Sequence, residues 1–260
     1  PIFCALLAYL YTLSYGGYFV IDSHTGAFLS PQWRWSVGLH RFLSKRALTT
    51  LVHNTSQETL VKGWGTNVLM VADPLGNGPV GEPFPFQDEF NIAVVNTFAP
   101  DEPLDLVFEA ARDLPDVRFY VTGKAGNISP ERLELKPDNC TLTGYLPYDT
   151  YTELLRGADA VIVLTTRNHT LLCGAYEAVS AGTPLITSDW PVLEEQFGQG
   201  AICVSNTVEG IRSGVRRARR EQQKLRQDVA RLKQDLQAAW EHQFAQLQHL
   251  MSGAEGGPKG

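Results

Sequence analysis

The stretch LTTRNHTLLCGAYEAVSAGTPLITSDWP, residues 164–191, decides how the chain folds. An apolar run that begins at residue 160 ends in two threonines, residues 165 and 166; a polar loop follows, and a helical pattern begins near Leu172. A second apolar run over residues 184–188 comes directly after that pattern. A strand, a helix and a strand in this order predict two parallel strands that are joined by a right-handed crossover.

Alternating strands and helices continue on both sides of this stretch. Further strands are expected at residues 92–97, 117–122, 140–143 and 201–204, and further helices at residues 103–112, 148–157 and 192–197. Such alternation is typical of a doubly wound parallel sheet with helices on both faces. The sequence therefore predicts a Rossmann-like α/β domain over residues 91–207.

A shorter block of the same kind precedes this domain. Its strands are expected at residues 18–22, 47–52 and 68–71, and its helices at residues 32–45 and 55–63. Residues 1–73 amount to roughly half of a Rossmann-like domain, and the chain begins at Pro1, so we expect the N-terminal domain to be partial. Residues 74–90 are rich in glycine and proline and are predicted to be a linker.

The C-terminal part of the chain has the pattern of one long helix. Apolar residues recur at steps of three or four from Leu225 to Met251, so a single helix is expected over residues 208–252. Residues 253–260 are predicted to be a disordered tail. The helix starts with a basic cluster of Arg212, Arg216, Arg217, Arg219, Arg220, Lys224 and Arg226.

Three roles remain open for this helix. Its basic cluster can dock to anionic lipid headgroups, which implies a peripheral contact with a membrane. Its apolar stripe can pair with another helix. The same stripe can instead pack back onto the N-terminal domain.

Composition excludes several classes of protein. An apolar fraction of 43% in 260 residues is enough for a sizeable core, and a net charge of −6 argues against a nucleic-acid partner. The apolar run over residues 1–15 is shorter than the stretch of about 20 residues that a membrane span needs. Four widely separated cysteines predict isolated buried thiols of a reducing compartment, with neither a disulfide nor a zinc site. These are Cys4, Cys140, Cys173 and Cys203.

The candidate ligand site follows from the predicted sheet, because open parallel sheets bind ligands at the carboxyl ends of their strands. The first amides of a helix and the helix dipole favour a phosphate group. Glu177 lies further along the same helix among small residues, and a ribose diol would suit it because a carboxylate accepts two hydroxyl hydrogen bonds. The amides predicted to bind the phosphate are those of Thr170, Leu171, Leu172, Cys173 and Gly174.

These residues also carry a family resemblance. The stretch EAVSAGTPLITSD, residues 177–189, resembles the signature of nucleotide-sugar glycosyltransferases of family 4 (group 1), which have the GT-B fold of two Rossmann-like domains. The segments VIDSHTGAF (residues 20–28), LVHNTSQETLVKGWG (residues 51–65) and LTGYLPYDTYTELLRGADAVIVLTT (residues 142–166) are similar to further parts of that family. The resemblance therefore extends over most of the chain.

The resemblance implies roles for individual residues. It implies that Glu177 binds the ribose of a nucleotide-sugar donor and that His24 lies beside the transferred sugar. It also implies that Tyr145 and Leu146 flank the nucleobase. It implies neither a cofactor nor a metal ion at this site.

Two departures from the family pattern concern the sugar and the donor phosphates. His169 occupies the position of the first glutamate of a conserved pair in the family, so we expect His169 to face the sugar together with His24. The loop NTFAPDEPLD, residues 96–105, lacks the basic pair that neutralises the diphosphate in the family. Arg167 and Lys124 are the nearest substitutes and are predicted to bind the diphosphate.

The function predicted from these features is that of a cytoplasmic, metal-independent glycosyltransferase. It would move a sugar from a nucleoside diphosphate sugar to a hydroxyl group of a glycan or lipid-linked acceptor, in the synthesis of a cell-surface polysaccharide or glycoconjugate. Two alternatives stay open. One is a nucleotide-sugar epimerase of the same fold, and the other is a non-catalytic relative that binds a nucleotide or a partner transferase.

Overall fold

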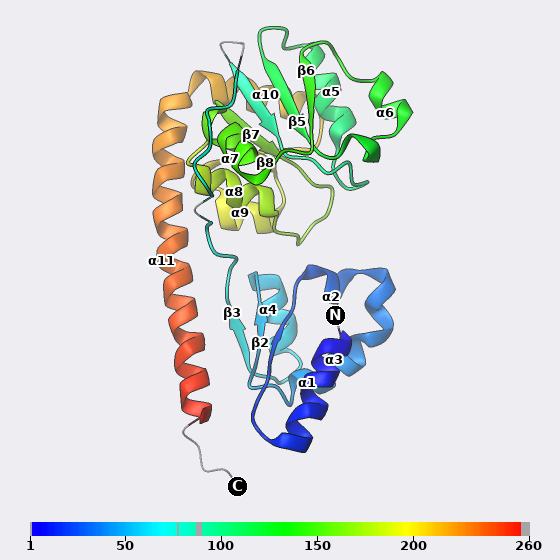
Figure 1. Ribbon diagram of the computed structural model, residues 1–260, viewed down its shortest axis with the longest axis vertical. Coiled ribbons are helices and arrows are strands. Elements are labelled where there is room, and N and C mark those ends of the chain that lie inside the picture. The colour runs from blue at the N-terminus through cyan, green and yellow to red at the C-terminus, as the bar shows by residue number, and fades with distance from the viewer. Residues whose placement is uncertain (1, 77, 87–89, 256–260) are drawn as a thin grey trace. The chain divides into compact units, whose positions relative to one another are not determined.

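A computed structural model describes residues 2–76, 78–86 and 90–255 of the chain. The described residues fall into two compact units (Figure 1). The first unit combines residues of Pro1–Pro74 with residues of Gln237–Gly260, and the second comprises Leu75–Leu236. Each unit contains a parallel sheet with helices packed on it, which confirms the α/β class predicted from the sequence.

The second unit is built on a six-stranded sheet in which all neighbouring strands are parallel. In chain order its strands are β4 (Asn91–Val94), β5 (Arg118–Thr122), β6 (Cys140–Gly144), β7 (Ala160–Val163), β8 (Leu185–Ser188) and β9 (Ala201–Val204). Their order in space is β6-β5-β4-β7-β8-β9. The order reverses between β4 and β7, and the carboxyl ends at such a point are where open α/β sheets bind ligands.

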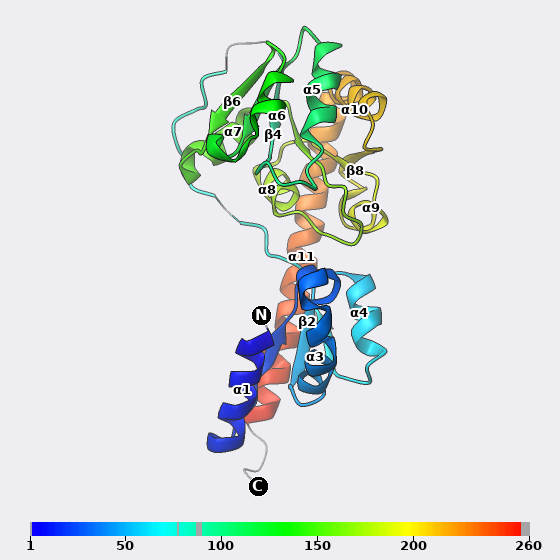
Figure 2. The ribbon, with the colours of Figure 1, turned by 90° about the vertical axis from the view of Figure 1, so that its right-hand side faces the viewer.

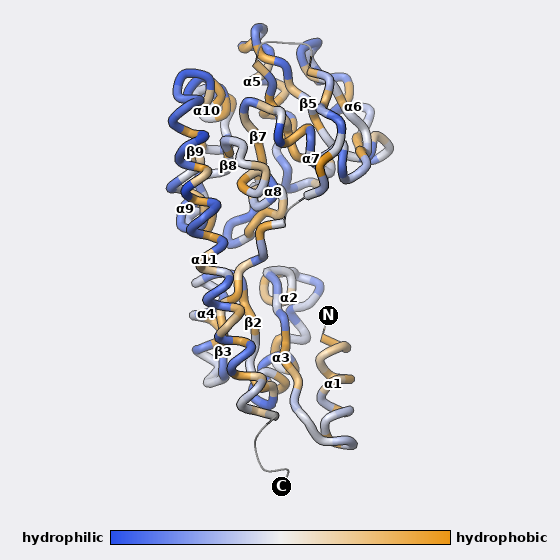
Figure 3. Tube along the Cα trace, turned by 60° about the vertical axis from the view of Figure 1, so that its left-hand side comes forward, coloured by the Kyte–Doolittle hydropathy of each residue, from blue (hydrophilic) through white to orange (hydrophobic). Residues whose placement is uncertain are grey.

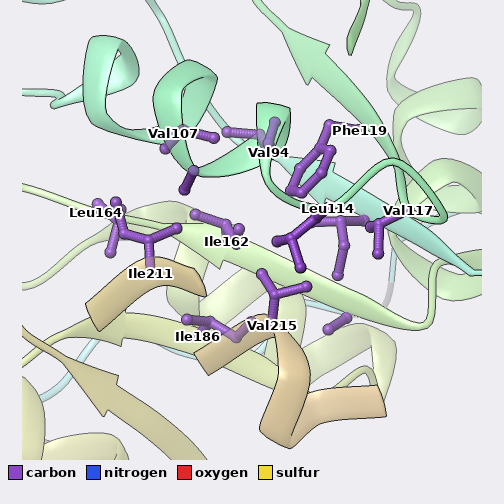
Figure 4. Packing of buried hydrophobic residues seen from close by; sticks show 14 of the residues in the cluster. Val94, Val107, Leu114, Val117, Phe119, Ile162, Leu164, Ile186, Ile211 and Val215 are labelled. Carbon is purple, nitrogen blue, oxygen red and sulfur yellow. The ribbon is translucent and has the colours of Figure 1, made fainter. Parts of the chain in front are cut away.

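Helices cover both faces of this sheet because its strands are apolar on both sides. Successive strand residues point to opposite faces, and all four residues of β7 are buried and apolar; the apolar character of β7 appears as orange in Figure 3. Figure 4 shows one of the two layers, in which Val107 and Ile211 lie close to Ile162. That layer is made by α5 (Leu104–Arg112) and α10 (Val208–Arg220), and the opposite layer by α7 (Tyr148–Gly157), α8 (Cys173–Ala181) and α9 (Pro191–Phe197). The short η2 (Ala125–Asn127) and α6 (Pro130–Glu134) follow β5.

The first unit has a parallel sheet of three strands in the order β1-β2-β3. These strands are β1 (Val20–Asp22), β2 (Thr49–Val52) and β3 (Val68–Met70). The helices of this unit before α11 are α1 (Ile2–Tyr15), α2 (Thr25–Leu29), η1 (Pro31–Ser36), α3 (Val37–Ser44) and α4 (Thr55–Lys62). Among them, α1 and α3 lie side by side, as Figure 1 and Figure 2 both show.

A histidine is buried in the core of the first unit. His40 is only 3% exposed, and its Nε2 lies 2.9 Å from Oγ of Ser23. Its ring stacks on Phe28 and meets the ring of Trp64 edge-on. Burial lowers the pKa of His40, because desolvation disfavours the charged imidazolium.

The single C-terminal helix predicted from the sequence is divided in the structure. Between α10 and α11 (Gln222–Glu255), Glu221 has φ −111° and ψ 18°, outside the helical region. Its amide donates to the carbonyl of Arg217, and its carbonyl accepts from the amide of Leu225, so Glu221 ends one helix and starts the next. An apolar periodicity continues across a break of one residue, and for that reason the pattern did not reveal it. Residues 253–255, expected in the tail, are helical, and residues 256–260 lie outside the described part of the chain.

The long helix α11 has residues in both units. Leu225, Val229 and Leu232 are buried among the apolar residues of the second unit. Within the first unit, Oε1 of Gln243 accepts a hydrogen bond of 2.9 Å from the amide of Ala72. In the part of the chain that the structure describes, no helix combines the length and the apolar character that crossing a bilayer requires.

Much of the predicted linker packs on the second unit. Arg156 donates hydrogen bonds of 2.7 Å to the carbonyls of both Gly78 and Pro79. Glu153 accepts a hydrogen bond of 3.1 Å from the amide of Gly81. These contacts hold the described part of residues 75–86 along α7, while residues 77 and 87–89 lie outside the described residues.

The cysteines differ in exposure. Cys140 is buried and Cys203 is half-buried, and burial raises the pKa of the Cys140 thiol to about 12. Cys4 and Cys173 are exposed, so the prediction of buried thiols is wrong for these two residues. Cys173 is exposed because it begins α8 at the carboxyl edge of the sheet, where a cavity opens.

Candidate functional site

A cavity of about 650 Å³ lies in the second unit at the carboxyl ends of β4, β5, β6 and β7. Its size is in the usual range for small-molecule sites, about 300–1,000 Å³. It brings together most of the residues that the sequence analysis assigned to the donor. Those that line it are Lys124, Tyr145, Leu146, Leu172, Cys173, Gly174 and Glu177.

The start of α8 forms one wall of the cavity. A side chain at Gly174 would place its Cβ 2.8 Å from Cγ1 of Val95 and 3.1 Å from Cγ1 of Val163, so only glycine lets the helix begin this close to the sheet. The residue before the helix, Leu172, has no side-chain group that could cap it. The first amides of a helix have no partners within the helix, and the helix dipole makes this end attractive to an anion.

Glu177 faces the same cavity from one turn further along α8. Its Oε2 accepts a hydrogen bond of 2.5 Å from the hydroxyl of Tyr151 on α7. Burial and the neighbouring Glu177 carboxylate raise the pKa of Tyr151 far above its usual value, so the phenol stays protonated and donates. Sequence reasoning missed Tyr151, since nothing in the spacing of α7 separates it from Tyr148.

A close approach between strand ends positions Lys124 beside the cavity. Gly123 has a φ of 125°, and a Cβ there would lie 2.7 Å from the carbonyl oxygen of Asn96, so glycine is required after β5. Lys124 follows directly and lines the cavity. Among the described residues that line the cavity, Lys124 is the only basic one.

Acidic residues of the loop after β4 also line the cavity, and both are engaged. The carboxylate of Glu102 accepts hydrogen bonds from the amides of Thr97 and Ala99. Asp101 forms an ion pair with Arg167, with 3.0 Å between Oδ1 and the guanidinium. Glu102 therefore stabilises its own loop, and Asp101 connects the loops after β4 and β7.

The remaining predicted residues of this unit lie in the loop before α8, outside the residues that line the cavity. The side chain of Arg167 is 64% exposed and points to Asp101. His169 is half-buried and has a left-handed φ of 64°, a conformation in which its amide bonds Oδ1 of Asn168. Thr170 and Leu171 are half-buried in the same loop.

Tyr145 and Leu146 form the opposite wall of the cavity, after β6. The side chain of Tyr145 is 82% exposed, whereas Leu146 packs against the apolar core below it. An exposed aromatic ring next to an aliphatic side chain is a suitable surface for a planar base. The structure therefore places these two residues where a stacked ring could lie.

His24 lies in the first unit, within a polar cluster that the sequence analysis did not identify. Its ring stacks on that of His53, with 4.1 Å between the centroids, and its Nε2 is 3.7 Å from Oδ2 of Asp22. His53 Nε2 is 2.8 Å from Oδ1 of Asp22, and its Nδ1 is 3.7 Å from Oδ1 of Asp73. These residues follow or end the three strands of the sheet, so the shared carboxyl edge brings them together.

Asp22 and His53 shift each other's pKa in this cluster. Burial lowers the pKa of His53, but the hydrogen bond to Asp22 and the charges of Asp22 and Asp73 outweigh it and raise this pKa. The hydrogen bond from His53 lowers the pKa of Asp22. Asp22, His24 and His53 also offer three metal-ligand atoms within 4.8 Å of one another. An ion lies in the plane of an imidazole that binds it, so the two stacked rings could share an ion only after one of them turned.

Most of the basic cluster at the start of the C-terminal helices is already paired. Arg212 contacts Asp113 and Glu209. Arg217 and Arg220 both contact Glu221. The ring of Phe90 lies 5.7 Å from the guanidinium of Arg219, and Arg226 donates to the carbonyl of Ala158.

Comparisons with known proteins agree with this architecture. No curated protein sequence matches the chain significantly. Among solved structures, HepE from Anabaena in complex with UDP is similar with a TM-score of 0.75 and 13% identity, over 97% of this chain and 77% of that one. Sucrose-phosphate synthase from Thermosynechococcus elongatus is similar with a TM-score of 0.74 and 14% identity, over 97% and 71%.

A third similar structure is that of the pneumococcal O-GlcNAc transferase GtfA in complex with UDP and GlcNAc. Its TM-score is 0.68 at 13% identity, over 93% of this chain and only 53% of GtfA. The chain thus spans between about half and three quarters of these structures. These likenesses confirm the predicted GT-B fold. The sequence profile of the family described as glycosyl transferase-like matches residues 105–249, which is more than half of the chain, and the chain therefore belongs to this family.

Proposed function

We propose that the chain transfers a sugar from a nucleoside diphosphate sugar to a hydroxyl group of a glycan or lipid-linked acceptor. The observation that carries this proposal is the cavity of the second unit, which places a helix start and a half-buried carboxylate at the carboxyl edge of the sheet. Two proteins of similar fold, HepE and GtfA, bind UDP. Family membership adds to the same proposal.

The donor would use each wall of the cavity for a different part. Glu177 would accept hydrogen bonds from the ribose hydroxyls, and the base would lie between Tyr145 and Leu146. The diphosphate would lie at the amides that lead into α8, with Lys124 nearby. Arg167 would join them if the diphosphate drew its guanidinium away from Asp101.

The chemistry proposed here needs no metal ion. Transfer would depend on holding the donor and the acceptor hydroxyl in position and on stabilising the diphosphate as it leaves. His24 and His169 would contact the sugar. This role is compatible with the structure of the His24 cluster, in which Asp22 and the stacked His53 ring fix the imidazole.

A peripheral contact with the inner face of the membrane belongs to the same proposal, since lipid-linked acceptors lie there. The ion pairs of Arg212, Arg217 and Arg220 leave less free positive charge than the sequence suggests. The contact would therefore depend on Arg216 and Lys224 more than on the cluster as a whole.

A second candidate is a protein that binds the nucleotide without transferring the sugar. The ion pair between Arg167 and Asp101 favours it, because it leaves Lys124 as the single described basic side chain that lines the cavity. A leaving diphosphate needs positive charge or aligned donors, and binding alone needs less. Turnover of the bound donor separates the two candidates.

The test is calorimetric titration with UDP-, GDP- and ADP-sugars, followed by measurement of donor hydrolysis and transfer. We expect one donor to bind. Glu177→Ala should weaken its affinity by about tenfold or more, because the variant lacks the carboxylate that would accept hydrogen bonds from the ribose hydroxyls. Arg167→Ala should reduce turnover more than affinity. Matched controls are Glu109→Ala and Arg231→Ala, which remove exposed charges elsewhere in the second unit. Donor affinity that survives both Glu177→Ala and Arg167→Ala would contradict the assignment of the site.

A further inference from the structure

The hydrogen bond between Tyr151 and Glu177 lies at the wall of the cavity in the second unit. The phenol oxygen is 2.5 Å from Oε2 of Glu177, and both side chains are half-buried and line the cavity. Tyr151 comes from α7 and Glu177 from α8, two helices that pack on the same face of the sheet (Figure 1). The bond therefore connects two helices at the point where a ligand would enter.

This bond leaves Glu177 able to bind a ligand. A carboxylate has four lone-pair sites on two oxygens, and the phenol uses one of them on Oε2. Oε1 of Glu177 has no hydrogen-bond partner among the described residues. Because the phenol remains protonated, it donates to the carboxylate and leaves the other lone-pair sites of Glu177 to a ligand.

The helix that carries Tyr151 is itself held in place. Thr152 of α7 packs closely against the segment before β4, since a Cβ at Gly78 would lie 2.7 Å from Cγ2 of Thr152. One turn later, Arg156 binds the carbonyls of residues 78 and 79. The phenol of Tyr151 is consequently a fixed donor, whereas a glutamate side chain has three rotatable bonds and loses entropy when it is ordered.

We propose that Tyr151 is a positioning residue, which holds the Glu177 carboxylate in the orientation that receives both hydroxyls of a ribose. The inference rests on the proposed function, since it takes a nucleoside diphosphate as the ligand of the cavity. A carboxylate that is already oriented pays less entropy when the diol binds, and this advantage exists only for a ligand that has the diol. Tyr151 therefore sets the preference of the cavity for ribonucleotides over nucleotides without the two hydroxyls.

The test compares Tyr151→Phe with the native chain in calorimetric titrations. The ligands are the ribonucleoside diphosphate that binds best among UDP, GDP, ADP and CDP, and its 2′,3′-dideoxy analogue. We expect Tyr151→Phe to weaken the affinity for the ribonucleotide by about tenfold, which is the loss associated with one hydrogen bond to a charged group. The affinity for the dideoxy analogue should stay unchanged. Tyr151→Phe combined with Glu177→Ala should bind no more weakly than Glu177→Ala alone, because Tyr151 acts through Glu177.

Tyr120→Phe is the matched control. Tyr120 is a buried tyrosine of the same apolar core, it lies against Phe84 and Phe86, and it does not line this cavity. Its replacement should change neither affinity. If Tyr151→Phe weakens the affinity for both nucleotides equally, or for neither, the phenol has only a structural role and the inference is wrong. If the native chain binds none of the four diphosphates, the proposed function fails, and this inference fails with it.

Discussion

The carboxyl edges of the two sheets are both formed by parallel strands, but they differ in whether their polar side chains bind one another or line a cavity. In the first unit this edge is occupied by Asp22, His24, His53 and Asp73, whose side chains already contact one another. In the second unit the same edge opens into a cavity of about 650 Å³, which is lined by Glu177, and Oε1 of Glu177 has no hydrogen-bond partner among the described residues. A parallel sheet thus determines where polar residues gather. The identity of their side chains determines whether these residues bind one another or line a cavity that can bind a ligand.

The difference indicates a division of work within the proposed function. A cavity lined by apolar walls and a few polar groups suits binding, because it removes a ligand from water and fixes its orientation. A set of histidines oriented by carboxylates suits contact with a reacting group, because their ring nitrogens are held in place. Binding and turnover are therefore expected to depend on different edges, binding on the second unit and turnover on the first.

The largest effect is expected from His24→Ala. His24 is proposed to hold the transferred sugar in position, and misplacing a reacting group can cost about 10²-fold in rate, so we expect donor turnover to fall about 100-fold. Because His24 belongs to the first unit, the affinity of the second unit for the nucleotide should stay unchanged. Steady-state turnover and calorimetric titration measure the two quantities separately.

His242→Ala is the control for this prediction, since His242 is an exposed histidine of the first unit outside the cluster. It should alter neither quantity. The proposed division would be contradicted if His24→Ala changed nucleotide affinity and left turnover as it was.

A smaller effect is expected from Gly174→Val, which tests whether the cavity depends on the close approach of α8. The new side chain would collide with Val95 and Val163, and overpacking of this kind typically costs about 1–3 kcal/mol of stability. Gly38→Val is matched in position, because Gly38 is also the second residue of its helix but has nothing within 4 Å of a built Cβ. Its effect should stay within about 0.5 kcal/mol.

Urea unfolding measures both variants, and titration with the nucleotide measures the cavity. Gly174→Val should lose nucleotide binding together with stability, since the same displacement moves the first amides of α8. Equal stability losses in the two valine variants would show that the close approach at Gly174 has no special role.

The sequence predicted the second unit better than the site it contains. Local patterns predict the strands because each central strand is an apolar run, and the Glu177 segment was found because small residues surround a lone carboxylate. The partners of these residues come from distant parts of the chain. Tyr151 lies 26 positions before Glu177, and Asp101 lies 66 before Arg167, so no local spacing could reveal either pair.

The first unit shows the same limit more strongly. The resemblance of a local segment predicts a role for His24, but His53 stacks on His24 and Asp73 contacts His53 only because β1, β2 and β3 are parallel and end at one edge. The break at Glu221 was missed for a different reason. A one-residue interruption shifts the helical phase too little to disturb an apolar stripe, so only the backbone angles reveal it.

The smallest effect is expected from pH and concerns the cores of the two units. Burial lowers the pKa of His40 in the first unit, so the unfolded chain binds a proton near pH 6.5 that the folded unit resists. This contribution to stability is therefore present above about pH 6.5 and is lost as the pH falls from there toward the lowered pKa. In the described part of the second unit, the buried polar side chains are those of asparagine, threonine and serine, which do not titrate in this range.

Hydrogen exchange of each unit, measured at about pH 7.5 and about pH 5 and corrected for the intrinsic rate, tests this contrast. We expect the first unit to lose protection on acidification relative to the second, and His40→Phe to reduce that loss because phenylalanine keeps the stacking on Phe28 without a titrating group. The raised pKa of His53 acts in the opposite direction, since a protonated His53 is stabilised by Asp22 and Asp73. The comparison between the native chain and His40→Phe isolates His40 from that opposing contribution. If the first unit lost the same amount of protection on acidification in the native chain and in His40→Phe, the loss would come from other groups of the first unit. The buried His40 would then have no part in the difference between the two cores.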